Sequence, residues 1–108
     1  MAASAFLAQA DAAFARIAAW LEKFDPDELD YSVGDGMVSI EFADGSRFVV
    51  SRQSAANQLW LAAAAHGWHY SWNESRQAWL DDKDGHELFA GLARVIGEQL
   101  GRQVFFDG

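Results

Sequence analysis

Carboxylates are the residues of this chain whose density could support chemistry. Five acids fall within nine positions, opposed only by a lysine at position 23: Glu22, Asp25, Asp27, Glu28 and Asp30. A helix cap or a linker needs one or two acids, and like charges at this density repel one another. Carboxylate oxygens are hard ligands that suit hard cations and discriminate little among them. The run favours weak, multi-site cation binding, with a merely solubilising charged segment as the alternative.

Asp11 is a sixth carboxylate of the predicted metal-binding set, and it precedes Glu22 by 11 residues. On a helix this spacing makes about three turns, so both acids lie on the same side. They are nevertheless about 16 Å apart along the helix axis, because each residue rises about 1.5 Å. Asp11 and Glu22 therefore cannot share one ion, and solvation is the simpler interpretation of Asp11.

Several other chemistries are excluded by residue type or spacing. The chain has no cysteine, which excludes disulfides, thiolate metal sites and cysteine nucleophiles. His66 and His69 form an H-x-x-H pair, but positions three apart on a strand face opposite sides, so they make a poor metal site. No nucleotide-binding or hydrolase motif occurs, and no carboxylate pair lies in an apolar neighbourhood. We expect a binding protein and not an enzyme.

The distribution of charge narrows the class of partner. Net charge is −8, and residues 1–45 carry nine acids against two bases, whereas residues 46–108 carry seven against six. This asymmetry argues against nucleic acid as a partner and for cations or a basic protein surface. No uncharged run approaches membrane-spanning length, and no basic segment precedes an apolar run as in a signal peptide. We expect neither a nucleic-acid nor a membrane partner.

Trp60 is the candidate anchor for a protein partner. In the run Asn57–Ala62, Leu59 and Leu61 alternate with Trp60 and point to the opposite face of a strand. Two predicted helices can cover one face of a sheet, and no third element is left for the other. The tryptophan is therefore predicted to be exposed on the open face, as interface hot spots often are. The alternative is a ring half-covered by its cross-strand neighbours.

Two amphipathic helices are predicted, one near each end of the chain. The first is capped by Ser4, ends at Asp25-Pro26, and has the apolar stripe Phe6, Ala10, Phe14, Ile17, Leu21 and Phe24. The second begins near His86, ends at Gly101, and has the stripe Phe89, Leu92, Ile96 and Leu100 with Leu88 and Val95 beside it. The segment 104–106 is apolar and should lie back against the helices.

Six strands are predicted between the helices from alternating apolar residues. They centre on Leu29/Tyr31/Val33, Val38/Ile40/Phe42, Phe48/Val50, Leu59/Leu61, Trp68/Tyr70/Trp72 and Ala78–Leu80. In the second hairpin, a three-residue loop with a left-handed Gly45 keeps one face apolar and pairs Glu41 with Arg47. Alternation does not decide whether Trp79 or Leu80 faces the core. The predicted fold is a single α+β domain over residues 1–108, a two-layer sandwich with both helices on one face of a six-stranded, mainly antiparallel sheet.

These features together resemble the frataxin family, in particular its bacterial branch. The resemblance spans residues 6–101, and its most specific parts are the segments 57–62 and 67–70. The segments 42–46 and 51–53, Trp79 and the pair 84–85 also match in order. The family fold is an α–β sandwich of this element order.

The resemblance implies an iron-binding adaptor or regulator of iron–sulfur cluster assembly, whose partners are the cysteine desulfurase and the scaffold protein. Iron, ferrous or ferric and weakly held, would bind at the acids that match the family's ridge: Glu22, Asp25, Asp27, Glu28 and Asp30. The family's exposed tryptophan corresponds to Trp60, and we place Asn57, Gln58, Arg52 and His69 with it in the partner-binding set. A cytoplasmic protein, monomeric when metal-free, is expected.

The sequence departs from the family pattern at Ala18 and Ala19, where bacterial relatives often carry acids, and at Lys23 inside the ridge. Reduced iron capacity is the implied consequence. The functional alternatives are an iron oxidase or iron-storage activity and an acidic mimic of nucleic acid. An oxidase would need clustered ligands and an oxygen site. A mimic would need acids spaced like phosphates, and it would leave Trp60 unexplained.

Overall fold

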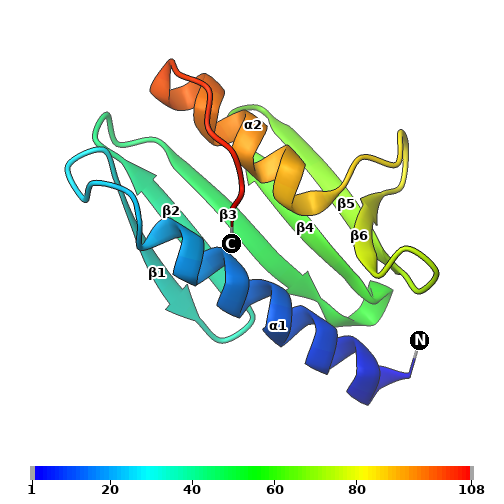
Figure 1. Cartoon of the computed structure of the whole chain (residues 1–108). Coiled ribbons are helices and arrows are strands. Elements are labelled where there is room, and N and C mark those ends of the chain that lie inside the picture. The colour runs from blue at the N-terminus through cyan, green and yellow to red at the C-terminus, as the bar shows by residue number, and fades with distance from the viewer. Residues whose placement is uncertain (1, 108) are drawn as a thin grey trace.

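Two helices lie on one face of a six-stranded antiparallel sheet whose strands follow chain order, β1 to β6 (Figure 1). The computed structural model describes residues 2–107. The elements are α1 (Ala3–Leu21), β1 (Leu29–Gly34), β2 (Met37–Phe42), β3 (Arg47–Gln53), the 3₁₀ turn η1 (Ser54–Ala56), β4 (Gln58–Ala63), β5 (His66–Asn73), β6 (Ala78–Asp81) and α2 (Leu88–Leu100). The predicted α+β fold class is confirmed.

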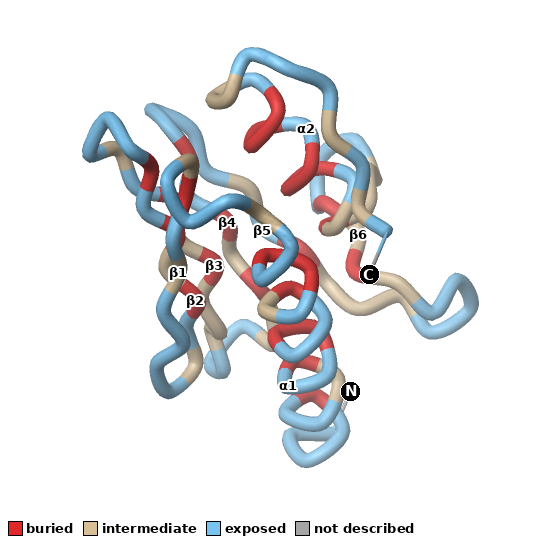
Figure 2. Tube along the Cα trace, turned by 60° about the vertical axis from the view of Figure 1, so that its left-hand side comes forward, coloured by how far each residue is buried: buried red, intermediate tan, exposed pale blue. Residues whose placement is uncertain are grey.

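The core fills the space between the helices and the sheet, and the buried residues of both helices face that space (Figure 2). On α1 the predicted stripe is buried from Phe6 to Leu21, together with Trp20, which the spacing argument missed. Phe24 lies beyond the helix and is only half-buried. Two backbone bonds to residues three positions earlier close the turn at Lys23 and Phe24, so α1 ends before Pro26.

The N-cap prediction for α1 was wrong. Ser4 lies inside the helix, and Ala2 occupies the cap position without a side-chain hydrogen bond. At α2 the cap is Glu87, whose carboxylate accepts from the backbone N–H groups of Phe89 and Ala90. Gly101 ends α2 with φ 73°, as predicted.

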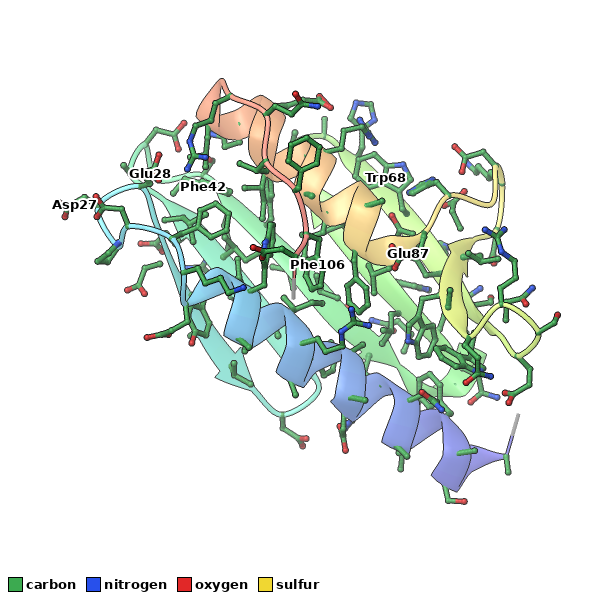
Figure 3. All side chains as sticks on the ribbon, in the orientation of Figure 1. Asp27, Glu28, Phe42, Trp68, Glu87 and Phe106 are labelled. Atoms are coloured by element: carbon green, nitrogen blue, oxygen red, sulfur yellow. The ribbon has the colours of Figure 1, made fainter. Side chains whose placement is uncertain are left out.

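The stripe on α2 is rotated from the prediction because the C-terminal segment packs on one of its sides. Leu88 is fully buried, whereas Phe89 and Leu100 are half-buried. The ring of Phe89 stacks on Phe106 at 4.4 Å between centroids, and Phe106 lies between the two helices (Figure 3). The Trp20 indole also donates to the carbonyl of Phe105. The segment 104–106 thus lies back against the helices as predicted, although the Phe105 side chain is exposed.

The hairpin register agrees with the prediction. Ile40 pairs with Phe48 and Glu41 with Arg47, whose side chains form an ion pair at 3.1 Å. Gly45 has φ 88°, the left-handed geometry that the three-residue loop requires. In β6 it is Trp79 that faces the core, where its ring meets Phe6 edge-on. Neither helix in the described part of the chain is long and apolar enough to cross a membrane.

Candidate functional site

The acidic ridge, defined as Glu22, Asp25, Asp27, Glu28 and Asp30, follows the turn from the end of α1 into β1. Local hydrogen bonds fold this turn. The Asp25 carboxylate accepts from the Asp27 N–H at 2.9 Å, and the Asp25 carbonyl accepts from the Glu28 N–H. Four of the five acids are exposed and Glu28 is half-buried. Figure 3 shows Asp27 and Glu28 on the loop beyond α1, away from the core.

The cations nearest the ridge are tied to the C-terminal segment. Lys23 pairs with Asp107 at 3.0 Å, and Arg102 pairs with Glu28 at 2.9 Å. Within the ridge, the Tyr31 hydroxyl donates to Glu22 at 2.5 Å, and this bond to the carboxylate raises the pKa of the tyrosine. The lysine inside the run therefore pairs outside it, and the ridge keeps a large excess of negative charge.

The ridge supplies hard oxygen donors without a preformed cage. Within residues 2–107, three potential metal-ligand atoms come within 4.8 Å of one another only at Asp81, Asp84 and His86. No three ridge carboxylates meet that distance. Exposed, separated carboxylates fit several weakly held hard cations better than one tightly held ion. Asp11 does not join the ridge, since its carboxylate pairs with Arg52 at 3.3 Å.

The open face of the sheet carries the second predicted site, here called the Trp60 patch: Met37, Ser51, Trp60 and His69, with Gln58 beside them. Strand register puts the first four in one row across β2, β3, β4 and β5. The helices cover the opposite face (Figure 1). The patch is therefore a mixed row, with the aromatic pair Trp60 and His69 at one end, on a sheet face that the helices do not cover.

The Trp60 ring is half-buried, so the prediction of an exposed ring was wrong and the ring is half-covered by its cross-strand neighbours, as in the alternative. The imidazole of His69 stacks on it with centroids 4.2 Å apart and planes inclined by 15°. Cross-strand neighbours in a sheet lie close enough for such stacking. The ring is thus held in place by its neighbour on β5.

A hydrogen-bond chain fixes the indole edge as well. The Trp60 N–H donates to the Gln58 side-chain carbonyl at 2.8 Å. The Gln58 amide nitrogen donates to Asp82, which also accepts from the Ser71 hydroxyl at 2.9 Å. This chain links β4, β5 and the loop after β6, so the ring orientation depends on three segments of the fold.

Of the other predicted partner-binding residues, Arg52 lies on the opposite face of the sheet and Asn57 lies in the turn before β4. Arg52 points to the helix side of the sheet, in phase with the buried Val50, where it reaches Asp11 and Asp35 at 3.3 Å each. Because side chains alternate along a strand, it cannot share a face with Trp60. Asn57 has φ 53° and ends η1 in the left-handed conformation. Its position before β4 is set by that turn.

The cluster of Asp81, at the end of β6, with Asp84 and His86, in the loop before α2, was not predicted from the sequence. The second helix was predicted to begin near His86, Asp84 entered only as part of the resemblance, and Asp81 was given no role. A signal existed in the spacing D-x-x-D-x-H, but only the folded loop brings the side chains together.

The structure defines a two-layer α+β domain with an acidic ridge at one end and the Trp60 patch on its open sheet face. A family model described as a frataxin-like domain matches residues 1–102, and the chain belongs to this family. The chain is similar to the iron-sulfur cluster assembly protein CyaY of Dechloromonas aromatica, with 40% identity over 102 residues and 94% of each chain covered. The CyaY protein of Ralstonia nicotianae is 38% identical over 100 residues, covering 89% of this chain and 86% of that one.

A solved structure gives the same result for the fold. The frataxin from Psychromonas ingrahamii superposes with a TM-score of 0.88 over 100% of both chains, at 29% sequence identity. The family resemblance noted in the sequence is therefore confirmed.

Proposed function

We propose that this protein is an adaptor in iron–sulfur cluster assembly that binds iron weakly on its acidic ridge and docks on a cysteine desulfurase and a scaffold protein. Relatives over nearly the whole chain are named iron-sulfur cluster assembly proteins. The observation that carries the proposal is the ridge itself, with five acids in nine residues and no cage of three among the described ridge residues. Such a surface can bind a cation weakly and can attract a basic protein surface.

The Trp60 patch supports the docking part of the proposal. A tryptophan that is already held by His69 and Gln58 loses little side-chain freedom on binding. Its uncharged ring offers apolar area in the same row as the exposed side chain of Met37. Tryptophan is among the residues most enriched in interface hot spots. Ridge and patch would therefore make different contributions, the first electrostatic and the second apolar.

An iron oxidase or storage activity is the alternative that the ridge supports less well. Oxidation of ferrous iron by oxygen needs ligands that converge on an ion with an open position. The ridge carboxylates are spread along a turn and a strand, which favours loose binding over such a centre. Measurement of iron oxidation by the purified protein distinguishes the two, because an adaptor should not raise the rate above that of iron in buffer.

A pull-down from a bacterial lysate tests the proposal. With the wild-type protein as bait, mass spectrometry should identify a cysteine desulfurase and an iron–sulfur scaffold. A bait with Glu22, Asp25 and Asp27 replaced by lysine should lose most of both partners while keeping its fold. Recovery of neither partner by the wild-type bait, or equal recovery by the lysine variant, would contradict the proposal.

A further inference from the structure

The loop between β6 and α2 gathers two carboxylates and an imidazole at a distance from the ridge. Ligand atoms of Asp81, Asp84 and His86 all lie within 4.8 Å of one another. The Asp84 carboxylate oxygen Oδ1 lies 2.5 Å from His86 Nδ1. This donor set mixes oxygen with nitrogen, whereas the ridge offers carboxylate oxygens alone.

The backbone holds the two carboxylates in place. Asp81 is buried, with 7% of its surface exposed, and its Oδ2 accepts from the N–H groups of Lys83 and Asp84 at 2.8 and 3.0 Å. Gly85 then takes φ 75°, and this left-handed residue stands between Asp84 and His86. The Asp84 carboxylate also accepts the His86 backbone N–H at 3.0 Å.

The histidine is positioned from behind by groups outside the cluster. Its Nε2 lies 2.6 Å from the hydroxyl oxygen of Tyr70, and the two rings meet edge-on with centroids 5.2 Å apart. Tyr70 is fully buried, so its hydroxyl lies in the core behind the imidazole ring. Metal-binding histidines usually engage their second nitrogen in this way, which fixes the ring and its tautomer.

Gly91 on α2 makes room for this arrangement. A Cβ at this position would lie 2.7 Å from the Tyr70 hydroxyl oxygen and 2.9 Å from the His86 ring. Separations this short do not occur for real Cβ atoms, so any side chain here would displace the pair. Helix, strand and loop thus all contribute to the orientation of one imidazole.

We propose that Asp81, Asp84 and His86 form a site for one divalent first-row transition ion, of the Zn²⁺ or Fe²⁺ type, separate from the ridge. Imidazole with carboxylates suits these ions, whereas Mg²⁺ and Ca²⁺ favour oxygen ligands alone. Zinc–ligand bonds of about 2.0–2.2 Å require the Asp84–His86 contact to open and the ion to lie between the two groups. His86 then binds the ion as the neutral Nε2–H tautomer: any proton on Nδ1 passes to water, the Nδ1 lone pair binds the ion, and Nε2, protonated from water where it carries no proton, donates to Tyr70. This site does not depend on the proposed function.

Zinc titration with histidine side-chain NMR tests the site. One equivalent of Zn²⁺ should shift the ring resonances of His86 before those of His66 or His69, and calorimetry should show one site stronger than the rest. Asp84→Asn is the primary variant, because that side chain is 70% exposed and its loss should leave the fold intact. It should weaken zinc binding at least about tenfold. Tyr70→Phe, with the fold checked by circular dichroism, should keep the stoichiometry and weaken binding about tenfold.

Two control variants separate this site from other histidines and from the ridge. His66→Ala should bind zinc as the wild type does. A ridge variant with Glu22→Gln, Asp25→Asn and Asp27→Asn should also keep the strong site, even if it loses partner proteins. Zinc that first perturbs the ridge, or an Asp84→Asn protein that binds zinc as tightly as the wild type, would overturn the assignment and show that Asp84 and His86 only brace the turn.

Discussion

The acidic ridge and the β6–α2 loop are both rich in carboxylates, but the two regions use them in opposite ways. In the loop each acid has a specific partner: Asp81 binds two backbone N–H groups, Asp82 binds Gln58 and Ser71, and Glu87 caps α2. In the ridge Glu28 binds Arg102 and Glu22 accepts a hydroxyl, while Asp25 and Asp30 satisfy only nearby N–H groups. The density of acids alone therefore does not predict their role. The hydrogen-bond partners of a carboxylate decide whether it stabilises the fold or stays available to bind a cation or another protein.

The largest difference between the regions should be in fold stability. Asp81→Ala should lower the free energy of unfolding by about 2–4 kcal/mol, because two N–H groups lose a buried ionised acceptor. Asp27→Ala, the matched ridge variant, should change it by less than about 0.5 kcal/mol, as exposed substitutions usually do. Urea unfolding of both variants measures the difference. Equal losses of unfolding free energy would contradict the difference between the two regions.

Cation choice should also separate the regions. Calcium, a hard ion, should shift or broaden backbone NMR signals of residues 22–30 first and leave the three histidines unaffected. The separated carboxylates of the ridge predict weak binding at more than one position. A calcium titration in which His66 or His69 responds first would show that the ridge is not the hard-cation site.

Low pH should destabilise the fold partly by protonating Asp84 in the β6–α2 loop. Hydrogen bonds from His86 lower the pKa of Asp84 below its ordinary value of 3.8, so the ionised form is favoured in the folded state. That contribution is present in full above the ordinary value and is lost as pH falls through the lower, folded-state pKa. Asp84→Asn should therefore flatten the fall in melting temperature below about pH 4. If the melting temperature of the variant falls at low pH as steeply as that of the wild type, Asp84 is not the cause of the acid sensitivity.

The smallest of these effects on stability should come from salt, which screens the ridge. Repulsion among exposed acids is screened by ions, so raising the salt concentration should raise the melting temperature by a few degrees, on the order of 0.5–1 kcal/mol. In the variant with Glu22→Gln, Asp25→Asn and Asp27→Asn the increase should be smaller. A melting temperature that ignores salt in the wild type would mean that the ridge carries little strain.

Much of the fold could be predicted from local sequence pattern. Alternation in Val38–Phe42 and Phe48–Val50, with a glycine that accepts positive φ, was enough to give the hairpin register. Periodicity failed where a distant segment competed for a helix face: the C-terminal segment packs on Phe89 and Trp20, and this moves the core stripe of α2 toward Leu88.

The site could be predicted less completely, for similar physical reasons. The ridge is contiguous in sequence, so its acids could be named directly. The stack of His69 on Trp60 depends on the pairing of β4 with β5, and the position of His86 depends on Tyr70 and Gly91. The resemblance grouped Arg52 with Trp60 as positions in the chain, and only the structure shows that their side chains point to opposite faces of the sheet.

Surface-plasmon kinetics against the cysteine desulfurase and the scaffold, at several salt concentrations, test the proposed division between ridge and patch most directly. Replacing Glu22, Asp25 and Asp27 with lysine should slow association and flatten its salt dependence, because exposed charge acts through long-range attraction. Trp60→Ala should instead speed dissociation, by roughly 30-fold or about 2 kcal/mol, with less than about 1 kcal/mol lost from fold stability. A Trp60→Ala protein that unfolds, or one that binds and dissociates like the wild type, would contradict the anchor, and a lysine variant with unchanged association would contradict the ridge.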